Sequence, residues 1–305
     1  MPFDPSDARS KLAGDTAVKA PPTAFAGAEY LRFYETPPTV VADGGRTWYG
    51  RGQNFVLEYT ELDGELEFAR TDQPDEYVVL LPDRAVTADV EAGDDRRSVH
   101  GDTLVFVPPG DSTVRLSGTG RVIRLLTSKA EDLASLAANA ASYEEHHPNV
   151  ADLEPWPDPV GGFRIRAYDL DVPPMDSPPF RLFRCTTFMV NYTGVQQGPR
   201  DTKKMSPHTH DDFEQCSLVI AGEYVHHIRW PWTTDLDAWR PDDHERCAAP
   251  HVCVIPPPAI HTSQAVDQGA NHLIDIFAPP RVDFSRMEGW VLNAEDYPPA
   301  PAVTG

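Results

Sequence analysis

Basic residues are scarce in this 305-residue chain. Lysine and arginine total 26 against 47 aspartates and glutamates, which gives a formal net charge of −21. Phosphate backbones and anionic membrane surfaces both require basic faces on the proteins that bind them. We therefore expect neither a nucleic acid nor a membrane among the partners of this chain. We interpret its acidity as a contribution to solubility.

Cysteine, glycine and long apolar runs are also limited. The four cysteines follow no CxxC spacing, so a chain of this length is not expected to carry a disulfide framework. No run approaches the length of a membrane span, and the N-terminus lacks the basic-then-apolar pattern of a signal peptide. A soluble, reducing, cytoplasmic setting is therefore the expectation. The 20 glycines are outnumbered by 31 prolines, which favours short strands joined by turns over a helical bundle.

Strand-like segments fill most of the chain. Short apolar runs bounded by turn residues recur over 46–126 and again over 163–278, which predicts an all-β protein. One helix is predicted over 132–145, because Ser128 and Glu131 have the spacing of a capping box before an Ala/Leu-rich segment. His146 and His147 follow it. Adjacent helical residues do not share a face, so we interpret this pair as a solvated helix end.

The segment 204–222 contains the sharpest chemical signal. His208 and His210 are two residues apart, so on an extended strand their imidazoles point to one side. Glu214 follows after a short polar turn. Neutral imidazoles with a carboxylate make a site for a divalent metal of the iron, manganese, zinc, nickel or copper type. A fourth donor has to come from elsewhere in the chain.

The two strand-rich halves can be aligned as an internal repeat. Residues 254–261 form a strand, a proline turn and His261, and 106–113 have the same form with Thr113 in place of the histidine. The same alignment pairs Glu214 with Glu76. It places Arg70 and Asp72 at the positions of His208 and His210. The first half thus keeps the scaffold and lacks all three histidines.

The order of these residues resembles the cupin family, and the repeat resembles a bicupin. The family's first motif is His-x-His, three or four residues, Glu, six residues and Gly. Residues 208–214 match it, with Gly222 one residue late. The second motif is Pro-x-Gly-x-x-His, which 256–261 match with proline in place of glycine.

The resemblance implies two tandem cupin barrels of the double-stranded β-helix or jelly-roll type, with one connecting helix. It implies that His208, His210, Glu214 and His261 coordinate one divalent metal ion, with Fe²⁺ favoured and Mn²⁺, Zn²⁺, Ni²⁺ and Cu²⁺ as alternatives. The divisions expected are a flexible arm (1–25), a metal-free N-terminal barrel (26–127), a helix and Pro-rich linker (128–162), a metal-binding barrel (163–280) and a Pro-rich tail (281–305). We also expect a homodimer or a higher homo-oligomer.

Four further residues are candidates for catalysis or substrate binding. Tyr224 and His226 share one face of a predicted strand, and we expect them to face inward, where pocket-lining and plain core roles both remain open. Arg229 is a cation near the motif and suits a substrate carboxylate. Gln264, three residues after His261, is a candidate for a hydrogen bond within the pocket.

Three function classes remain open at this stage. The first is a mononuclear Fe(II)-type oxygenase or dioxygenase acting on a small polar or aromatic organic acid. The second is a metal-dependent isomerase or lyase of a sugar acid or keto acid, with His226 or Tyr224 moving the proton. The third is a non-enzymatic binding protein for a small molecule. The fold alone does not choose among them.

Overall fold

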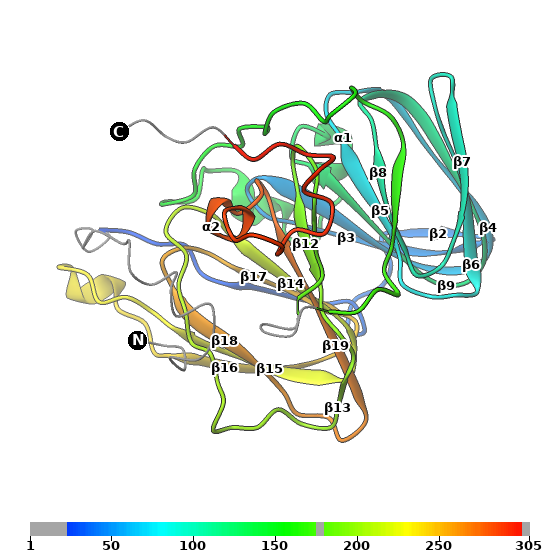
Figure 1. Ribbon diagram of the computed structural model, residues 1–305. Coiled ribbons are helices and arrows are strands. Elements are labelled where there is room, and N and C mark those ends of the chain that lie inside the picture. Colours follow the sequence, from blue (N-terminus) through cyan, green and yellow to red (C-terminus); the bar gives the residue numbers. More distant parts are fainter. Residues whose placement is uncertain (1–22, 175–179, 301–305) are drawn as a thin grey trace.

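The structure is a computed structural model, and it describes residues 23–174 and 180–300. Two sheet systems lie against each other, with the N-terminal half in blue to cyan and the C-terminal half in yellow to orange (Figure 1). Strand segments account for most of both halves, as the prediction of two tandem barrels requires. No helix among the described residues is long and apolar enough to cross a membrane.

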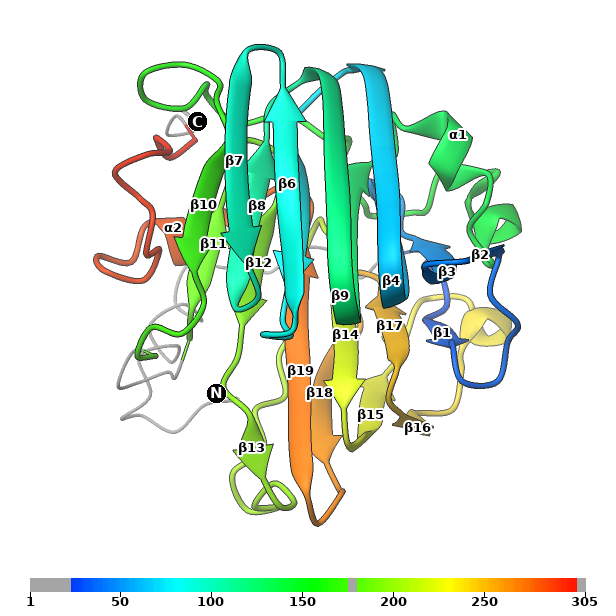
Figure 2. The same cartoon turned by 90° about the vertical axis from the view of Figure 1, so that its right-hand side faces the viewer.

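The N-terminal half is one nine-stranded antiparallel sheet that curls on itself. Its path is β10-β8-β5-β9-β4-β3-β2, and β6 pairs with both β9 and β7. Figure 2 shows β7, β6, β9 and β4 side by side. The strands are β2 (Val40–Ala42), β3 (Gly45–Arg51), β4 (Phe55–Gln73), β5 (Tyr77–Leu81), β6 (Val86–Ala92), β7 (Asp95–His100), β8 (Thr103–Val107), β9 (Gly110–Thr127) and β10 (Arg166–Asp169).

The C-terminal half consists of two sheets. A seven-stranded sheet runs β1-β17-β14-β19-β12-β11, with β13 paired to β19, and a three-stranded sheet runs β16-β15-β18. The strands are β1 (Glu29–Arg32), β11 (Leu182–Arg184), β12 (Met189–Tyr192), β13 (Gln196–Gln197), β14 (Gln215–Ala221), β15 (Glu223–Arg229), β16 (Asp243–Ala248), β17 (His251–Ile255), β18 (Ile260–Ala265) and β19 (Ala270–Phe277).

Each half contributes one strand to the other. Strand β1 pairs antiparallel with β17 of the C-terminal half, and β10 pairs antiparallel with β8 of the N-terminal half. The predicted boundaries at 26–127 and 163–280 therefore divide the chain differently from the sheets. The reason is that β1 and β10 complete a sheet edge of the opposite half, a pairing that local sequence patterns do not specify.

The connection between the halves is less helical than predicted. Only α1 (Glu131–Ala134) and a 3₁₀ turn (Ala140–Tyr143) form within the range 132–145. Helix α1 ends at Ala134, and farther along the Asn139 side chain pairs with both backbone groups of Arg51, at 3.0 and 2.8 Å. The other short turns are a 3₁₀ turn at Leu236–Ala238 and α2 (Val282–Ser285).

The described residues include little of the predicted N-terminal arm and most of the predicted C-terminal tail. Most of the predicted N-terminal arm, 1–22, lies outside the described residues. In the predicted tail, Phe284, Trp290 and Val291 pack against Phe277 at the side of the C-terminal barrel. The tail therefore packs on the C-terminal barrel through these residues, and farther along Tyr297 reaches the N-terminal half, where its hydroxyl donates to Glu76 at 2.9 Å.

The main apolar cluster lies between the two large sheets. It combines Leu57, Tyr59, Val78, Leu80 and Phe106 of the N-terminal half with Cys216, Leu218, Val254, Ile274 and Ile276 of the C-terminal half. Side chains alternate across a strand. The other faces of β14, β17 and β19 therefore point into the C-terminal barrel.

The interior of the N-terminal barrel is filled by side chains. Its cluster is almost entirely aliphatic, with Val79, Leu81, Val105, Val114 and Leu126 among its members. Within the N-terminal half, Glu58 and Arg124 form a buried ion pair across β4 and β9. In the internal repeat, Arg70 is at the position equivalent to His208. Its two terminal nitrogens bind Asp132.

We predict that Glu58→Gln lowers the free energy of unfolding by about 3–5 kcal/mol, because it leaves Arg124 buried without its counter-charge. The matched control is Glu67→Gln, which removes the exposed partner of Arg115 and is expected to cost less than about 1 kcal/mol. Urea denaturation measures both. Equal losses in the two variants would contradict the prediction.

Candidate metal centre

Three histidines from two distant segments meet inside the C-terminal barrel. His208 and His210 lie in the loop before β14, and His261 lies on β18. A backbone bridge joins the segments, with His208 N donating to His261 O at 3.0 Å and His261 N donating to His208 O at 2.8 Å. One ring nitrogen of each histidine lies within 4.8 Å of the others. Among the described residues, this is the group of three or more potential ligands that is close enough to hold one metal ion.

Backbone carbonyls fix the tautomers of two of these histidines. His208 Nδ1 lies 2.9 Å from Ser206 O, and His261 Nδ1 lies 3.0 Å from Ala259 O. A carbonyl oxygen only accepts hydrogen bonds, so each Nδ1 carries the proton. The lone pair is therefore on Nε2 of both rings, which is the arrangement of a metal-ligating histidine held by its second nitrogen.

Burial keeps two of the histidines neutral. The pKa of His210 lies well below the usual range, first because the ring is buried and then because Arg281, His261 and His208 are close. Burial, with His208 as the next cause, also holds the pKa of His261 well below its usual range. Only a neutral imidazole can bind a metal, so these rings are competent as ligands at neutral pH.

The fourth group at this cluster is Gln215. Its Oε1 lies 2.8 Å from His210 Nε2 and 3.3 Å from His261 Nε2. Its Nε2 donates to Asp275 Oδ1 at 2.9 Å and to Ser217 Oγ at 3.0 Å, so the oxygen is the atom that faces the histidines. His261 Nε2 and Gln215 Oε1 are both acceptors, and no hydrogen can lie between them. Two acceptors that face each other in this way fit a shared cation.

Glu214 lies away from the histidines, which corrects its prediction as a ligand. Its Oε2 accepts from Gln53 N at 2.6 Å, and its Oε1 accepts from Tyr143 Oη at 3.2 Å and from His147 Nδ1 at 3.0 Å. Consecutive residues at the start of a strand point to opposite sides. Because Gln215 points into the barrel, Glu214 points toward the N-terminal half.

His147 is buried and not a solvated helix end as predicted. Its Nε2 donates to Ser142 O at 2.7 Å, while Nδ1 faces the Glu214 carboxylate. Burial disfavours its charged form, but the hydrogen bonds to Glu214 and Ser142 outweigh burial and raise its pKa. The resulting pair ties the linker to the loop before β14. His146 remains largely exposed, beside Asp152.

The spacing to Gly222 is the signal that identifies Gln215. The family motif has six residues between its carboxylate and its glycine, and six residues separate position 215 from Gly222. Four residues separate His210 from position 215, which the motif also allows. Glutamine was missed because it is not among the common metal-ligand residue types.

The structure separates the four predicted catalytic residues into two pairs. Tyr224 and His226 are buried on the inner face of β15, as predicted. Gln264 lies on the outer face of β18, where its Oε1 binds His227 Nε2 at 3.0 Å. Gln264 and His261 are an odd number of residues apart on one strand, so they point to opposite faces. The prediction that Gln264 faces the pocket therefore disagrees with the structure. The prediction for Arg229 disagrees as well, because its side chain is 71% exposed and pairs with Asp242.

His226 belongs to a hydrogen-bonded chain that crosses the barrel. His251 Nδ1 lies 2.8 Å from Ala248 O, so it carries the proton and leaves His251 Nε2 as an acceptor. His226 Nε2 lies 2.8 Å from that atom and must donate to it. The Nδ1 of His226 is then an acceptor, and it lies 2.9 Å from Ser263 Oγ. Burial holds the pKa of His226 well below its usual range, so the ring is a neutral base.

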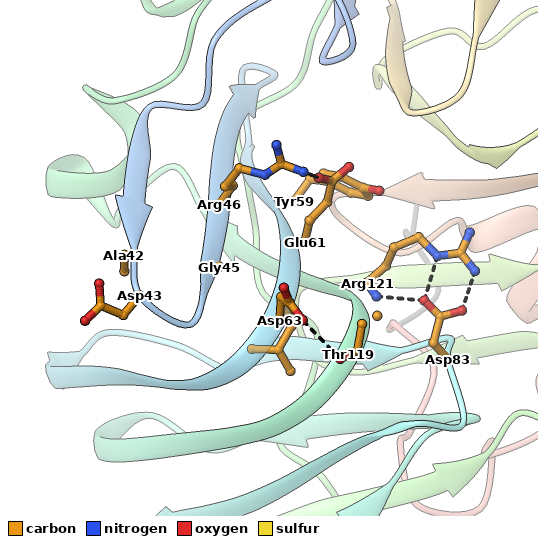
Figure 3. A pocket seen from close by; sticks show the side chains of 12 residues that line it. Ala42, Asp43, Gly45, Arg46, Tyr59, Glu61, Asp63, Asp83, Thr119 and Arg121 are labelled. Atoms are coloured by element: carbon orange, nitrogen blue, oxygen red, sulfur yellow. Dashed lines mark hydrogen bonds and ion pairs between the residues drawn. The ribbon is translucent and has the colours of Figure 1, made fainter.

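A separate surface pocket of about 630 Å³ lies on the N-terminal half. Figure 3 shows that its charged side chains are largely paired, with Arg121 on Asp83 and Arg46 beside Glu61. It shares no residue with the histidine cluster. The surface pocket and the histidine cluster are therefore two separate features of the described residues.

Comparisons with known proteins identify a shared fold. No protein-family model matches the sequence, and no curated protein matches it significantly. Among solved structures, a formate complex of Lactobacillus farciminis oxalate decarboxylase has a TM-score of 0.56 at 13% identity, covering 86% of this chain and 90% of that chain. Bacillus subtilis oxalate decarboxylase, a protein with Mn(II) centres, gives 0.55 at 12% identity, covering 89% and 82%. AerE from Microcystis aeruginosa gives 0.51 at 7% identity, covering 85% and 100%.

We predict that His261→Ala and Gln215→Ala reduce bound metal from about one ion per chain, because each removes one of four donors. Glu214→Gln is expected to retain the metal and to lower the urea midpoint, because it weakens the pair with His147. Elemental analysis after loading with Fe(II) or Co(II) measures the first effect. Loss of metal in Glu214→Gln with retention in Gln215→Ala would reverse the assignment.

We predict a stability dependence on pH from His251, whose pKa burial lowers to about 4. Between pH 6.5 and 4 the unfolded chain binds a proton here that the folded chain does not, so the free energy of unfolding falls as pH falls. The contribution is about 3 kcal/mol, present in full above pH 6.5 and lost at pH 4. Urea denaturation of metal-free protein at several pH values measures how the free energy of unfolding depends on pH. In His251→Gln the slope of this dependence should be smaller by the equivalent of about one proton. An unchanged slope would refute this origin.

Proposed function

The chain has the bicupin fold, and we propose that it is a metal-dependent enzyme acting on a small organic acid. One divalent cation would be held by His208, His210, His261 and Gln215. The observation that carries this proposal is the set of facing acceptors, because His261 Nε2 and Gln215 Oε1 lie 3.3 Å apart with no hydrogen to share. Such an arrangement is stable when a cation lies between the acceptors.

The charge of the ligand set indicates the kind of substrate. Three neutral imidazoles and one amide oxygen would leave a dication with its full charge inside a barrel. When bound there, a divalent cation would supply Lewis-acid polarisation of a substrate oxygen and open coordination positions. An anionic group on the substrate, such as a carboxylate, would compensate that charge. This supports an organic acid as the substrate class.

The barrel wall offers polar groups that can orient a substrate. Asn191 on β12 is directly opposite Asp275 in the sheet register, so the two side chains share the inner face. The Oδ1 atom of Asn191 is buried and has no hydrogen-bond partner among the described residues. Burial raises the pKa of Tyr224, so its hydroxyl stays protonated and acts as a donor instead of a base. An acceptor and a donor in one barrel suit a polar ligand.

The first candidate reaction is that of a mononuclear Fe(II)-type oxygenase. The donor set contains three imidazoles and no carboxylate, which suits iron, nickel, copper or zinc better than manganese. Iron is the ion in this series that commonly combines substrate binding with O₂ chemistry. In this reading His226, kept neutral by burial, accepts a hydrogen bond from Ser263 Oγ and orients that hydroxyl toward a polar group of the substrate.

The second candidate is a metal-dependent lyase or isomerase, favoured by the Ser263–His226–His251 chain. A neutral histidine whose orientation is fixed on its far side has the arrangement of a general base. Two of the similar structures are oxalate decarboxylases, which by name remove a carboxyl group from an organic acid. In a Lewis-acid mechanism of this second class, the cation would polarise a substrate oxygen, and the reaction would consume no O₂.

We predict that Fe(II)-loaded protein consumes O₂ in the presence of a small organic acid from a panel of keto, hydroxy and aromatic acids. His261→Ala should abolish the uptake, and Arg229→Ala, a surface variant, should keep it. An oxygen electrode and product analysis measure the reaction. Turnover of the same acids under argon with Zn(II) or Mn(II) would identify the lyase or isomerase instead. Binding without any turnover would contradict both enzyme classes.

A further inference from the structure

We propose that Asp275 is the positioning residue of the metal centre. It would hold the Gln215 amide with its oxygen toward the histidines. It would also supply, through that amide, the negative charge that a glutamate would carry in the fourth position. This inference rests on the proposed function, because it concerns the same centre. It assigns a role to a residue whose carboxylate lies outside the group of converging ligand atoms.

The contacts of Asp275 determine the orientation of the amide. Its Oδ1 accepts from Gln215 Nε2 at 2.9 Å and from Ser217 Oγ at 3.0 Å. An ionised carboxylate accepts hydrogen bonds and donates none. If the amide turned over, its oxygen would face the carboxylate oxygen, and its NH₂ group would point at the histidine nitrogens. The carboxylate therefore selects the orientation in which Gln215 can act as a ligand.

The sheet register makes this arrangement rigid. Ser217 on β14 is directly opposite Asp275 on β19, and Gln215 is two residues before Ser217 on the same inner face. The outer faces of both strands are buried in the cluster between the two halves. Neither strand can slip by one residue without exchanging its polar and apolar faces. The distance between Asp275 and Gln215 is thus set by the backbone.

The charge balance gives Asp275 a second effect. A carboxylate that accepts from an amide NH₂ polarises the amide, which places more negative charge on its oxygen. The Gln215 oxygen becomes a better donor toward a cation, while the formal charge stays one hydrogen bond away from it. Partners in this position commonly change metal affinity by about 10- to 100-fold.

The test compares Asp275→Asn, Gln215→Glu and the double variant in metal-free protein titrated with Co(II) and Mn(II) under argon. Asp275→Asn should weaken Co(II) binding by about 10- to 100-fold, because the new amide can turn a donor toward Gln215. Gln215→Glu alone should also weaken binding at neutral pH, because two carboxylates in contact share a proton that the metal has to displace. Asp267→Asn, an exposed aspartate at the turn before β19, is the matched control and should bind as the wild type does.

The double variant decides the proposal. It moves the negative charge from position 275 to position 215, and we expect Co(II) affinity to return to within about threefold of wild type while affinity for Mn(II) rises, because carboxylate suits Mn(II). A folding defect caused by Asp275→Asn would not be repaired by Gln215→Glu. Recovery of affinity and of the Co(II) absorption bands therefore supports the coupling.

Two results would overturn the inference without affecting the proposed function. One is wild-type affinity in Asp275→Asn. The other is a double variant whose loss equals the product of the two single losses. The proposed function fails separately, if wild-type protein binds no metal or if His261→Ala binds it unchanged.

Discussion

The alternation of side chains along β14 and β19 is the constraint on which the candidate site depends. One face of these central strands is buried in the apolar cluster between the two halves, through Cys216, Leu218 and Ile276. The opposite face must then project into the C-terminal barrel, and it carries Gln215 and Asp275. Packing between the halves thus selects the groups that face the histidines.

The same alternation accounts for the shared role of two acids at equivalent positions of the repeat. Glu214 and Glu76 each immediately precede a central strand, β14 and β5. Each carboxylate reaches a backbone N–H of the opposite half, Glu214 at Gln53 and Glu76 at Thr186. The repeat therefore uses its equivalent acids to join the halves. Because the Glu214 carboxylate takes part in this contact between the halves, it is not available as a metal ligand.

Sequence patterns captured what depends on local periodicity. Most of the strands lie within the predicted regions 46–126 and 163–278, and the inward direction of Tyr224 and His226 followed from alternation along β15. His208 and His210 followed from residue type and spacing, whereas His261 followed from the resemblance to the second cupin motif. Long-range pairing was beyond such patterns: the exchange of β1 and β10, the burial of His147 and the capture of the Arg51 backbone by Asn139 all depend on a partner distant in sequence.

The two barrels balance the buried polar groups of their interiors in different ways. In the N-terminal half, aliphatic side chains fill the interior, and the buried charges of Glu58 and Arg124 neutralise each other directly. In the C-terminal half, the buried polar groups leave acceptors facing one another at His261 and Gln215. Unmatched buried acceptors destabilise a fold unless something binds them. The facing acceptors at His261 and Gln215 therefore support the proposal that this interior binds a cation.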